Sequence, residues 1–314
     1  MRLVHLDTDL GGDIDDLCAL ALVLAWPDTR LIAVTTNSED SGRRAGYARA
    51  ALTLAQREDV PVAAGADAAD GYYRVWPGLP DEAAFWPDPP IHRPVPPLPG
   101  RVEQALALLE SSIRRGALII AIGALTNLAL LEQRQPGILQ NAHLVVMGGF
   151  LRPPRAGYPR WDYTEDWNLQ VDVASALTVL RSAEPLLVPL TVTVETCLRH
   201  SHLGTLRQGG PLAALIAHQA LAFERTEGLA ERVLPTSPAL PADLINFLHD
   251  PLACAIALGW DQGVCIETVP ITSSVEGGWL RQRAEPTGKP TRMVTAVDGP
   301  ALDAHWLATV CRGA

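Results

Sequence analysis

Residues 5–16 read His5-Leu6-Asp7-Thr8-Asp9-Leu10-Gly11-Gly12-Asp13-Ile14-Asp15-Asp16, and this stretch decides the fold. The apolar pair Leu3-Val4 precedes it, and an almost wholly apolar run, residues 17–26, follows it. We therefore predict a strand, a glycine turn and a buried helix whose first turn is rich in aspartate. Ligands of open α/β sheets gather at the carboxyl ends of the strands, so this turn is a candidate active site.

Five carboxylates fall within the ten positions from Asp7 to Asp16. One or two aspartates there would be ordinary helix caps, which bond free backbone N–H groups at the positive end of the helix dipole. Five exceed any need for capping, and clustered carboxylates repel one another unless a cation lies among them. Because Ca²⁺ and Mg²⁺ prefer oxygen ligands, a divalent metal site is the leading interpretation. The alternative is an acidic, solvated loop.

Composition limits the class of protein. Of the 314 residues, 48% are hydrophobic and 19% charged, which favours a sizeable core and argues against global disorder. The net charge of −10 argues against nonspecific binding to nucleic acid or to anionic membranes. The five cysteines form no CxxC pair, as expected for reduced thiols, and no apolar run is long enough to span a membrane. We expect a cytoplasmic protein.

Strand-like and helix-like segments alternate along the chain. Further strands are expected at 31–36, 60–65, 117–122, 142–147, 263–270 and 292–297, and strand material with a break is expected at 186–194. Helices are expected at 41–57, 101–115, 128–133, 171–182, 211–225, 244–258 with an interruption near His249, and 300–311. This order predicts one α/β domain over residues 1–314, with an open, mostly parallel (mixed) β-sheet, helices on both faces, a Rossmann-like core and an active site at the C-terminal ends of the strands. Irregular insertions are expected at about 66–100 and 151–167, the first either a lid or interface element or a packed surface insertion.

Other polar residues also follow predicted strands. They are Asn37 and Asp40, Thr126-Asn127 and Gly148-Gly149. Their convergence fits a crevice at one edge of the sheet, although Thr126-Asn127 could equally be an ordinary helix N-cap.

A His-Asp pair, His249-Asp250, lies between apolar stretches, where it is costly unless both side chains are engaged. His249 could be a hydrogen-bonded core residue. Asp250 favours a functional interpretation, because it could supply a distant ligand to the N-terminal cation while His249 acts as a general acid. Asp166-Trp167-Asn168 is either a helix cap with a packed tryptophan or a binding site for a polyol.

In order along the chain, these segments resemble the inosine–uridine-type nucleoside hydrolase family, which opens with the pattern DxDxGxDD. The matching segments are the Asp7–Asp16 stretch, a longer variant of that pattern, VTT (34–36), GALTNLAL (123–130), VVMGG (145–149), DWN (166–168), HDPLA (249–253) and VTAVD (294–298). The resemblance spans residues 3–311. It implies hydrolysis of ribonucleosides to ribose and free base with one bound Ca²⁺, and a homodimer or homotetramer.

The resemblance also implies a role for each matching residue. Asp9, Asp16, the backbone carbonyl of Thr126 and Asp250 would hold the ion. Asp9 would also act as the base on a calcium-bound water that attacks C1′. Asp15 and Asn168 would bind the ribose 2′- and 3′-hydroxyls, Asp166 the 5′-hydroxyl, and His249 would protonate the leaving base.

The chain departs from the family pattern on the ribose side. The extra residues around Gly12-Asp13 leave open whether Asp13 takes one of the roles given to Asp15. The family's asparagine after the second strand aligns with Asp40, and Asn37 is the alternative. Asp166 stands where glutamate is commoner. Base preference is not readable, and stacking on the base is a hypothesis for Tyr158 or Trp161.

Two other functions compete with this one. A haloacid-dehalogenase-like phosphatase would also place Asp7-x-Asp9 after a strand, but its motif wants Thr or Val where this chain has Gly11. A noncatalytic Ca²⁺-dependent protein that binds nucleosides or sugars would keep the same carboxylates. The presence of Asp9 and His249 argues against it.

Overall fold

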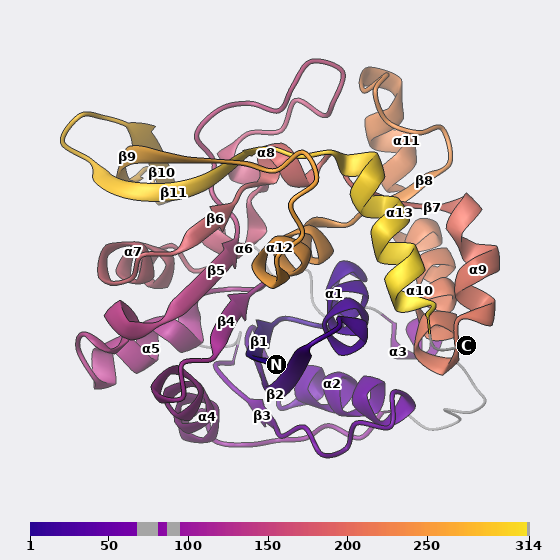
Figure 1. Ribbon diagram of the computed structural model, residues 1–314, viewed down its shortest axis with the longest axis horizontal. Helices are drawn as coiled ribbons and strands as arrows, with labels where there is room; N and C mark the ends of the chain where they lie inside the picture. The colour runs from indigo at the N-terminus through magenta and orange to yellow at the C-terminus, as the bar shows by residue number, and fades with distance from the viewer. Residues whose placement is uncertain (68–80, 87–94, 313–314) are drawn as a thin grey trace.

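The protein is built around a nine-stranded sheet (Figure 1). The computed structural model describes residues 1–67, 81–86 and 95–312. In spatial order the strands are β10 (Trp279–Ala284), β9 (Cys265–Glu276), β11 (Lys289–Ala296), β6 (Leu186–Val188), β5 (His143–Met147), β4 (Leu118–Ala121), β1 (Arg2–Thr8), β2 (Thr29–Thr36) and β3 (Val62–Ala64). From β11 to β3 every neighbouring pair is parallel, whereas β9 and β10 are antiparallel to their neighbours. The predicted mixed, mostly parallel sheet is confirmed.

Helices cover both faces of the sheet (Figure 1). In chain order the helices of the described residues, not all of which lie on the sheet, are α1 (Asp15–Ala25), α2 (Arg43–Leu54), α3 (Glu82–Phe85), α4 (Val102–Arg114), α5 (Thr126–Arg134), α6 (Trp167–Gln170), α7 (Val173–Ser182), α8 (Leu190–Thr193), α9 (Leu203–Gln208), α10 (Pro211–Glu227), α11 (Leu229–Val233), α12 (His249–Leu258) and α13 (Gly299–Val310). In β5, Val145 and Met147 join the core under α1 and α12, whereas Leu144 and Val146 join the core under α5 and α7. Both faces of the strand are therefore buried, as expected for parallel sheets.

Two expected elements differ in the structure. Residues 244–258 are a strand, β8 (Leu244–Phe247), followed by α12, and not one interrupted helix. The chain turns at Leu248, and Pro251 lies in the first helical turn, where its missing N–H costs no hydrogen bond. Strand β8 pairs with β7 (Cys197–Arg199) in a separate small sheet. Residues 190–193 form α8 and continue no strand.

The two predicted insertions have different outcomes. Residues 151–166 are irregular apart from a short 3₁₀ turn, Tyr163–Glu165. Most of the segment 66–100 lies outside the described residues. Its described part contains α3, which packs on α10 and is fixed by a 2.8 Å hydrogen bond between the His218 ring and the Ala84 carbonyl.

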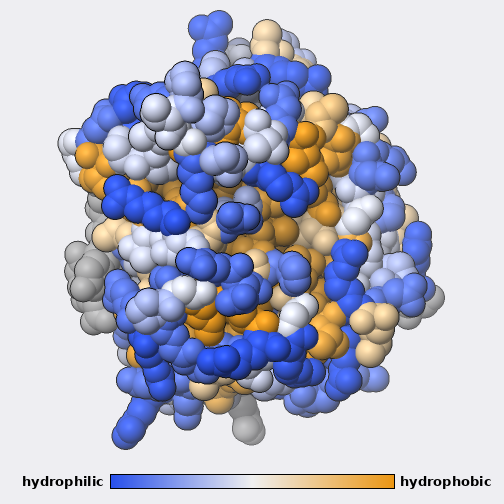
Figure 2. All heavy atoms as spheres, turned by 60° about the vertical axis from the view of Figure 1, so that its left-hand side comes forward, coloured by the Kyte–Doolittle hydropathy of each residue, from blue (hydrophilic) through white to orange (hydrophobic). Residues whose placement is uncertain are grey.

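The surface mixes apolar and polar side chains. On the face drawn in Figure 2, hydrophobic residues show between bands of hydrophilic ones. Among the described residues, no helix is both long and apolar enough to cross a membrane.

A buried chain of polar side chains links α4, β1 and β2 and ends at Asp7. The ring of His5 bonds Ser112 Oγ through Nδ1 (2.8 Å) and Thr35 Oγ1 through Nε2 (2.9 Å). The Thr35 hydroxyl donates to Asp7 Oδ1 at 2.5 Å, so His5 Nε2 is the protonated nitrogen. Burial lowers the pKa of His5 to about 3. The histidine is therefore neutral, with one tautomer fixed by its neighbours.

Because His5 is buried in its neutral form, we expect it to lower the free energy of unfolding as the pH falls. The folded-state pKa of about 3 lies below the ordinary value of 6.5, so between these values the unfolded chain binds a proton that the folded one does not. Stability from this group is complete above pH 6.5 and is lost as the pH falls. Between pH 6.5 and 5.0 the loss is about 2 kcal/mol. Urea unfolding at both pH values should show a smaller loss in His5→Gln than in the wild type, while exposed His143→Gln serves as control. Equal losses in all three proteins would contradict the prediction.

Candidate active site

A cavity of about 460 Å³ opens beyond the C-terminal ends of the central parallel strands. Asp9 follows β1, Ile122 follows β4 and Met147 ends β5, and all three residues line the cavity. Residues of α10 and of the β8–α12 junction form the opposite wall. The predicted location of the site, at the carboxyl ends of the strands, therefore coincides with the cavity.

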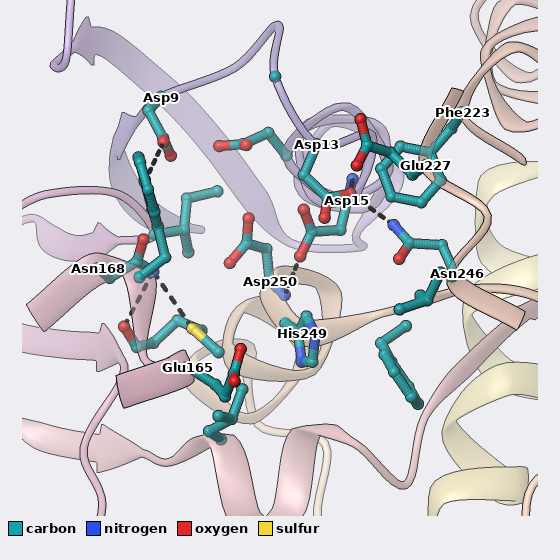
Figure 3. Close-up of a pocket in the computed structure, with 18 of the residues that line it drawn as sticks. Asp9, Asp13, Asp15, Glu165, Asn168, Phe223, Glu227, Asn246, His249 and Asp250 are labelled. Carbon is teal, nitrogen blue, oxygen red and sulfur yellow. Dashed lines mark hydrogen bonds between the residues drawn. The ribbon is translucent and has the colours of Figure 1, made fainter. Parts of the chain in front are cut away.

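Three buried carboxylates lie close together in its wall, and two of them, Asp15 and Asp250, are labelled in Figure 3. One oxygen each from Asp15, Asp16 and Asp250 lie within 4.8 Å of one another. Asp15 and Asp16 begin α1 and Asp250 lies in the first turn of α12, so the packing of these two helices brings them together. The backbone N–H of Asp250 donates to Asp15 Oδ2 at 3.3 Å, and the Thr8 hydroxyl donates to Asp16. Helix starts 235 residues apart in sequence thus form one acidic cluster.

The cluster is electrostatically costly without a cation. Burial raises the pKa of Asp15, Asp16 and Asp250 well above the ordinary value, and repulsion from neighbouring aspartates raises it further. Closely spaced carboxylate oxygens are the donors that hard divalent cations prefer. The donor set therefore fits a Ca²⁺ or Mg²⁺ ion.

Asp9 lies beside this cluster with a different set of partners. Its Oδ2 accepts a hydrogen bond of 3.2 Å from the indole Nε1 of Trp167 (Figure 3). Its Oδ1 lies next to Gly123 and the amide of Asn37. Burial raises the pKa of Asp9, and the charge of Arg44 opposes that shift. One carboxylate oxygen of Asp9 is thus fixed by Trp167.

The space around Asp9 depends on Gly123. A Cβ added there would lie 2.8 Å from Asp9 Oδ1 and 2.7 Å from Asn37 Oδ1, both closer than real Cβ contacts. Gly123→Ala is therefore expected to displace Asp9 and to lower kcat for base release by about tenfold or more. Gly204→Ala is the control, because Gly204, like Gly123, has no positive φ, and a Cβ at Gly204 meets nothing within 4 Å. Wild-type kcat in Gly123→Ala would show that Asp9 has room to move.

Thr126 and Asn127 are not helix caps. The N-cap of α5 is Leu125, and no side chain caps that helix. Thr126 Oγ1 donates to Asp172 at 2.7 Å. Asn127 Nδ2 donates to Asp7 Oδ1 at 2.8 Å, and its Oδ1 accepts from the backbone N–H of Ala66. Thr126 is thereby linked to the start of α7, and Asn127 to the end of β1.

Asp7 supports the site from below. Its carboxylate accepts hydrogen bonds from Thr35, Asn37 and Asn127, and it is fully buried. Burial raises its pKa to about 6. Asn37 is itself fully buried and donates to Asp7 Oδ2 at 3.1 Å, so its amide lies behind Asp9 and is not part of the cavity wall.

The predicted ribose contacts divide into two groups. Asn168 lines the cavity and donates to the Met147 carbonyl at 3.1 Å. Asp166 is buried, and its carboxylate accepts from the N–H groups of Gly149 (2.6 Å) and Leu169 (3.3 Å) as the N-cap of α6. Asp166 therefore lies outside the cavity wall, where neighbouring Glu165 takes its place. Asp40 is exposed and also lies outside the wall.

Asp13 has a defined partner in the structure. It lines the cavity, and its Oδ1 accepts hydrogen bonds from Asn246 Nδ2, on β8, and from the backbone N–H of Asp15 at 3.3 Å. Asn246 has no counterpart among the sequence predictions, because the strand that carries it was expected to be helical. The extra residues of the opening stretch thus connect it to the opposite wall.

His249 lies at the cavity among aromatic rings. Its Nδ1 bonds Thr193 Oγ1 at 2.7 Å, and its ring centroid is 5.2 Å from Phe247 and 6.2 Å from Trp161. Burial lowers the pKa of His249 to about 3. The imidazole is therefore neutral near pH 7 in the ligand-free protein.

Several cavity residues were not anticipated from the sequence. They are Arg44, Phe85, Phe223, Glu227, Leu229, Arg232 and Asn246. Of the two aromatic residues suggested for stacking, Trp161 lines the cavity, whereas Tyr158 does not and packs near Arg155. Phe223 and Glu227 are one helical turn apart on α10, so helical periodicity could have placed them on one face, but the predicted helix 211–225 ended before Glu227. Nothing in the spacing indicated Arg44.

Known proteins resemble the chain over nearly its full length. A curated relative is the pyrimidine-specific ribonucleoside hydrolase RihA of Klebsiella pneumoniae, 28% identical over 94% of this chain and 88% of that protein. Among solved structures, the inosine–guanosine nucleoside hydrolase (IG-NH) aligns with a TM-score of 0.74 at 17% identity, covering 99% of each chain. The purine-preferring ribonucleoside hydrolase of Gardnerella vaginalis aligns with a TM-score of 0.71 at 21% identity, covering 99% of this chain and 98% of that one. These structures share the fold, and the names of the three proteins differ in base preference.

The family profile described as inosine-uridine preferring nucleoside hydrolase matches residues 4–304. The match includes the Asp7–Asp16 stretch, the strand ends around the cavity and the His249-Asp250 pair. The chain therefore belongs to the inosine-uridine preferring nucleoside hydrolase family, a family of enzymes that hydrolyse ribonucleosides.

Proposed function

We propose that the protein hydrolyses the N-glycosidic bond of ribonucleosides to ribose and free base with Ca²⁺ as its cofactor. The observation that carries this proposal is the trio Asp15, Asp16 and Asp250 in the wall of a 460 Å³ cavity, with Asp9 beside it. Buried carboxylates at this spacing need a cation, and a cavity of this size accommodates a small ligand.

Asp16 and Asp250 belong to the proposed ion site under every assignment. The family resemblance adds Asp9 and the backbone carbonyl of Thr126, whereas the observed trio adds Asp15. Asp15 therefore serves either as a ligand or, as the resemblance implies, as a contact to the ribose hydroxyls. A bound divalent cation would orient the sugar diol and lower the pKa of a water molecule.

Asp9 is the proposed general base. The transition state for N-glycosidic cleavage resembles an oxocarbenium ion, so the carboxylates around the ribose stabilise its developing positive charge. Asn168 is the proposed contact to the ribose hydroxyls because, unlike Asp166, it lies in the cavity wall. Asp166 is occupied as a helix cap, and we propose no contact between it and the 5′-hydroxyl.

His249 is the proposed contact to the leaving base. The Thr193 hydroxyl donates to the Leu190 carbonyl at 3.2 Å, so Nδ1 of the neutral imidazole donates to Thr193 Oγ1 and Nε2 is free to accept. Nε2 would therefore take up a proton before giving one to the leaving base. Trp161 and Phe247 pack against His249, and both of them, like Phe223, line the cavity and can stack on a base. We also propose the homodimer or homotetramer that the resemblance implies.

A panel of purine and pyrimidine nucleosides, assayed for free base with and without a chelator, tests the proposal. We expect base release that the chelator abolishes and added Ca²⁺ restores. Release of phosphate from phosphorylated substrates, with no base release, would instead indicate the phosphatase. Ca²⁺-dependent binding of nucleosides without turnover would indicate the noncatalytic protein.

A further inference from the structure

The side chain of Trp167 lies at the cavity and is hydrogen-bonded to Asp9, the proposed base. Its indole Nε1 donates to Asp9 Oδ2 at 3.2 Å, and the residue lines the cavity. It is only partly buried, so part of the indole faces the space that a substrate would occupy.

The backbone around Trp167 fixes where its ring can lie. Trp167 is the first residue of α6, and Asp166 caps that helix while also accepting from the Gly149 N–H at the end of β5. On the other side, Asn168 donates to the Met147 carbonyl at 3.1 Å. Both neighbours of Trp167 are therefore tied to the strand that borders the cavity, which holds the indole against Asp9.

The second oxygen of Asp9 lies on a crowded side. Gly123 leaves just enough room for Asp9 Oδ1 and the Asn37 amide, and Asn37 is held by Asp7. A carboxylate with one oxygen bonded to an indole and the other confined beside a glycine has little freedom to rotate. A reacting group held in one orientation avoids the entropic cost of finding it during the reaction.

We propose that Trp167 is a positioning residue for the hydrolysis: its indole N–H, bonded to Oδ2, holds the carboxylate of Asp9 in one orientation at the cavity. This inference rests on the proposed function, in which Asp9 is the base. A phenylalanine would keep the aromatic ring and lose the N–H donor, so the role belongs to the tryptophan N–H and not to ring packing.

The test is Trp167→Phe, assayed for base release from a nucleoside that the wild type hydrolyses. We expect kcat to fall about 10- to 100-fold, the loss that corresponds to a hydrogen bond with a charged group, with KM changed by less than about threefold. The matched control is Trp161→Phe, which makes the same change in the same cavity at a residue that packs on Phe247 and His249. That variant should change KM more than kcat.

Tryptophan fluorescence gives a readout that does not depend on turnover. Because Trp167 contacts Asp9 beside the acidic cluster, Ca²⁺ added to the chelator-treated protein should change the emission of the wild type and of Trp161→Phe, but not of Trp167→Phe. Thermal unfolding would verify that both variants are folded. An unchanged kcat in Trp167→Phe, or a retained Ca²⁺ response, would overturn the inference. Absence of base release by the wild type would instead refute the proposed function.

Discussion

Asp9→Asn is expected to lower kcat for base release by about 10²–10⁴-fold, the usual contribution of a positioned acid or base. Asparagine is isosteric with aspartate, and its amide oxygen can still accept the hydrogen bond from Trp167 Nε1. The variant therefore keeps the local packing and loses the charge and the basicity. Steady-state kinetics with a chromatographic assay for free base measures the effect.

The control for Asp9→Asn is Asp40→Asn. Asp40 also follows a parallel strand, but it is exposed and lies outside the cavity wall. We expect its kcat and KM to stay within about twofold of the wild type, as for surface substitutions in general. A large effect at Asp40 would support the family alignment over the observed side-chain position, and normal turnover in Asp9→Asn would exclude Asp9 as the base.

The sequence was informative about the strand ends and less so about the directions of side chains. Apolar runs and glycine turns predicted the parallel sheet, and the density of aspartates predicted an acidic site at its carboxyl edge. Asp250 was connected to that site from the sequence, because an isolated acid among apolar residues needs a partner. These predictions follow from burial and periodicity, which a single sequence displays directly.

The exact set of clustered carboxylates depended on tertiary packing. The resemblance implies a sugar contact for Asp15, and the packing of α1 on α12 places its carboxylate beside those of Asp16 and Asp250 as well, so it could also be a ligand to the ion. Asp166 was expected to face the substrate, yet the Gly149 and Leu169 N–H groups take both of its oxygens. The direction of a single side chain decides whether it faces the ion, the substrate or the protein interior. The spacing of residues along the chain does not encode that direction.

The prediction of one interrupted helix at 244–258 was wrong for a similar reason. A strand of only four residues, three of them apolar, followed one residue later by a largely apolar helix has no change of period long enough to detect. That error concealed Asn246, whose side chain bonds Asp13 from the opposite wall. The hydrogen bond between Asn246 and Asp13, one of the extra residues of the opening stretch, could therefore be recognised only in the folded structure.

Asp250→Asn is expected to weaken the response of the protein to Ca²⁺ strongly. Saturating the wild type at 100 times the dissociation constant should stabilise it by about 2.7 kcal/mol, seen as an increase in Tm. Removing one carboxylate of the trio should weaken Ca²⁺ binding by at least about 10–100-fold, the range known for the less direct partners of metal ligands. Titration calorimetry and thermal unfolding with and without Ca²⁺ measure both quantities, and base release should be lost with them.

The chelator-treated proteins distinguish a metal site from a site that is merely acidic. Without a cation, Asp250 adds repulsion to two buried neighbours whose pKa values burial has already raised. Asp250→Asn should therefore match or exceed the Tm of the chelated wild type, and yet be less stable than the wild type once Ca²⁺ is present. Asp261→Asn removes an exposed charge just beyond the other end of α12 and should keep the full Ca²⁺ response. An equal rise in Tm with Ca²⁺ in Asp250→Asn and the wild type would show that the ion binds elsewhere.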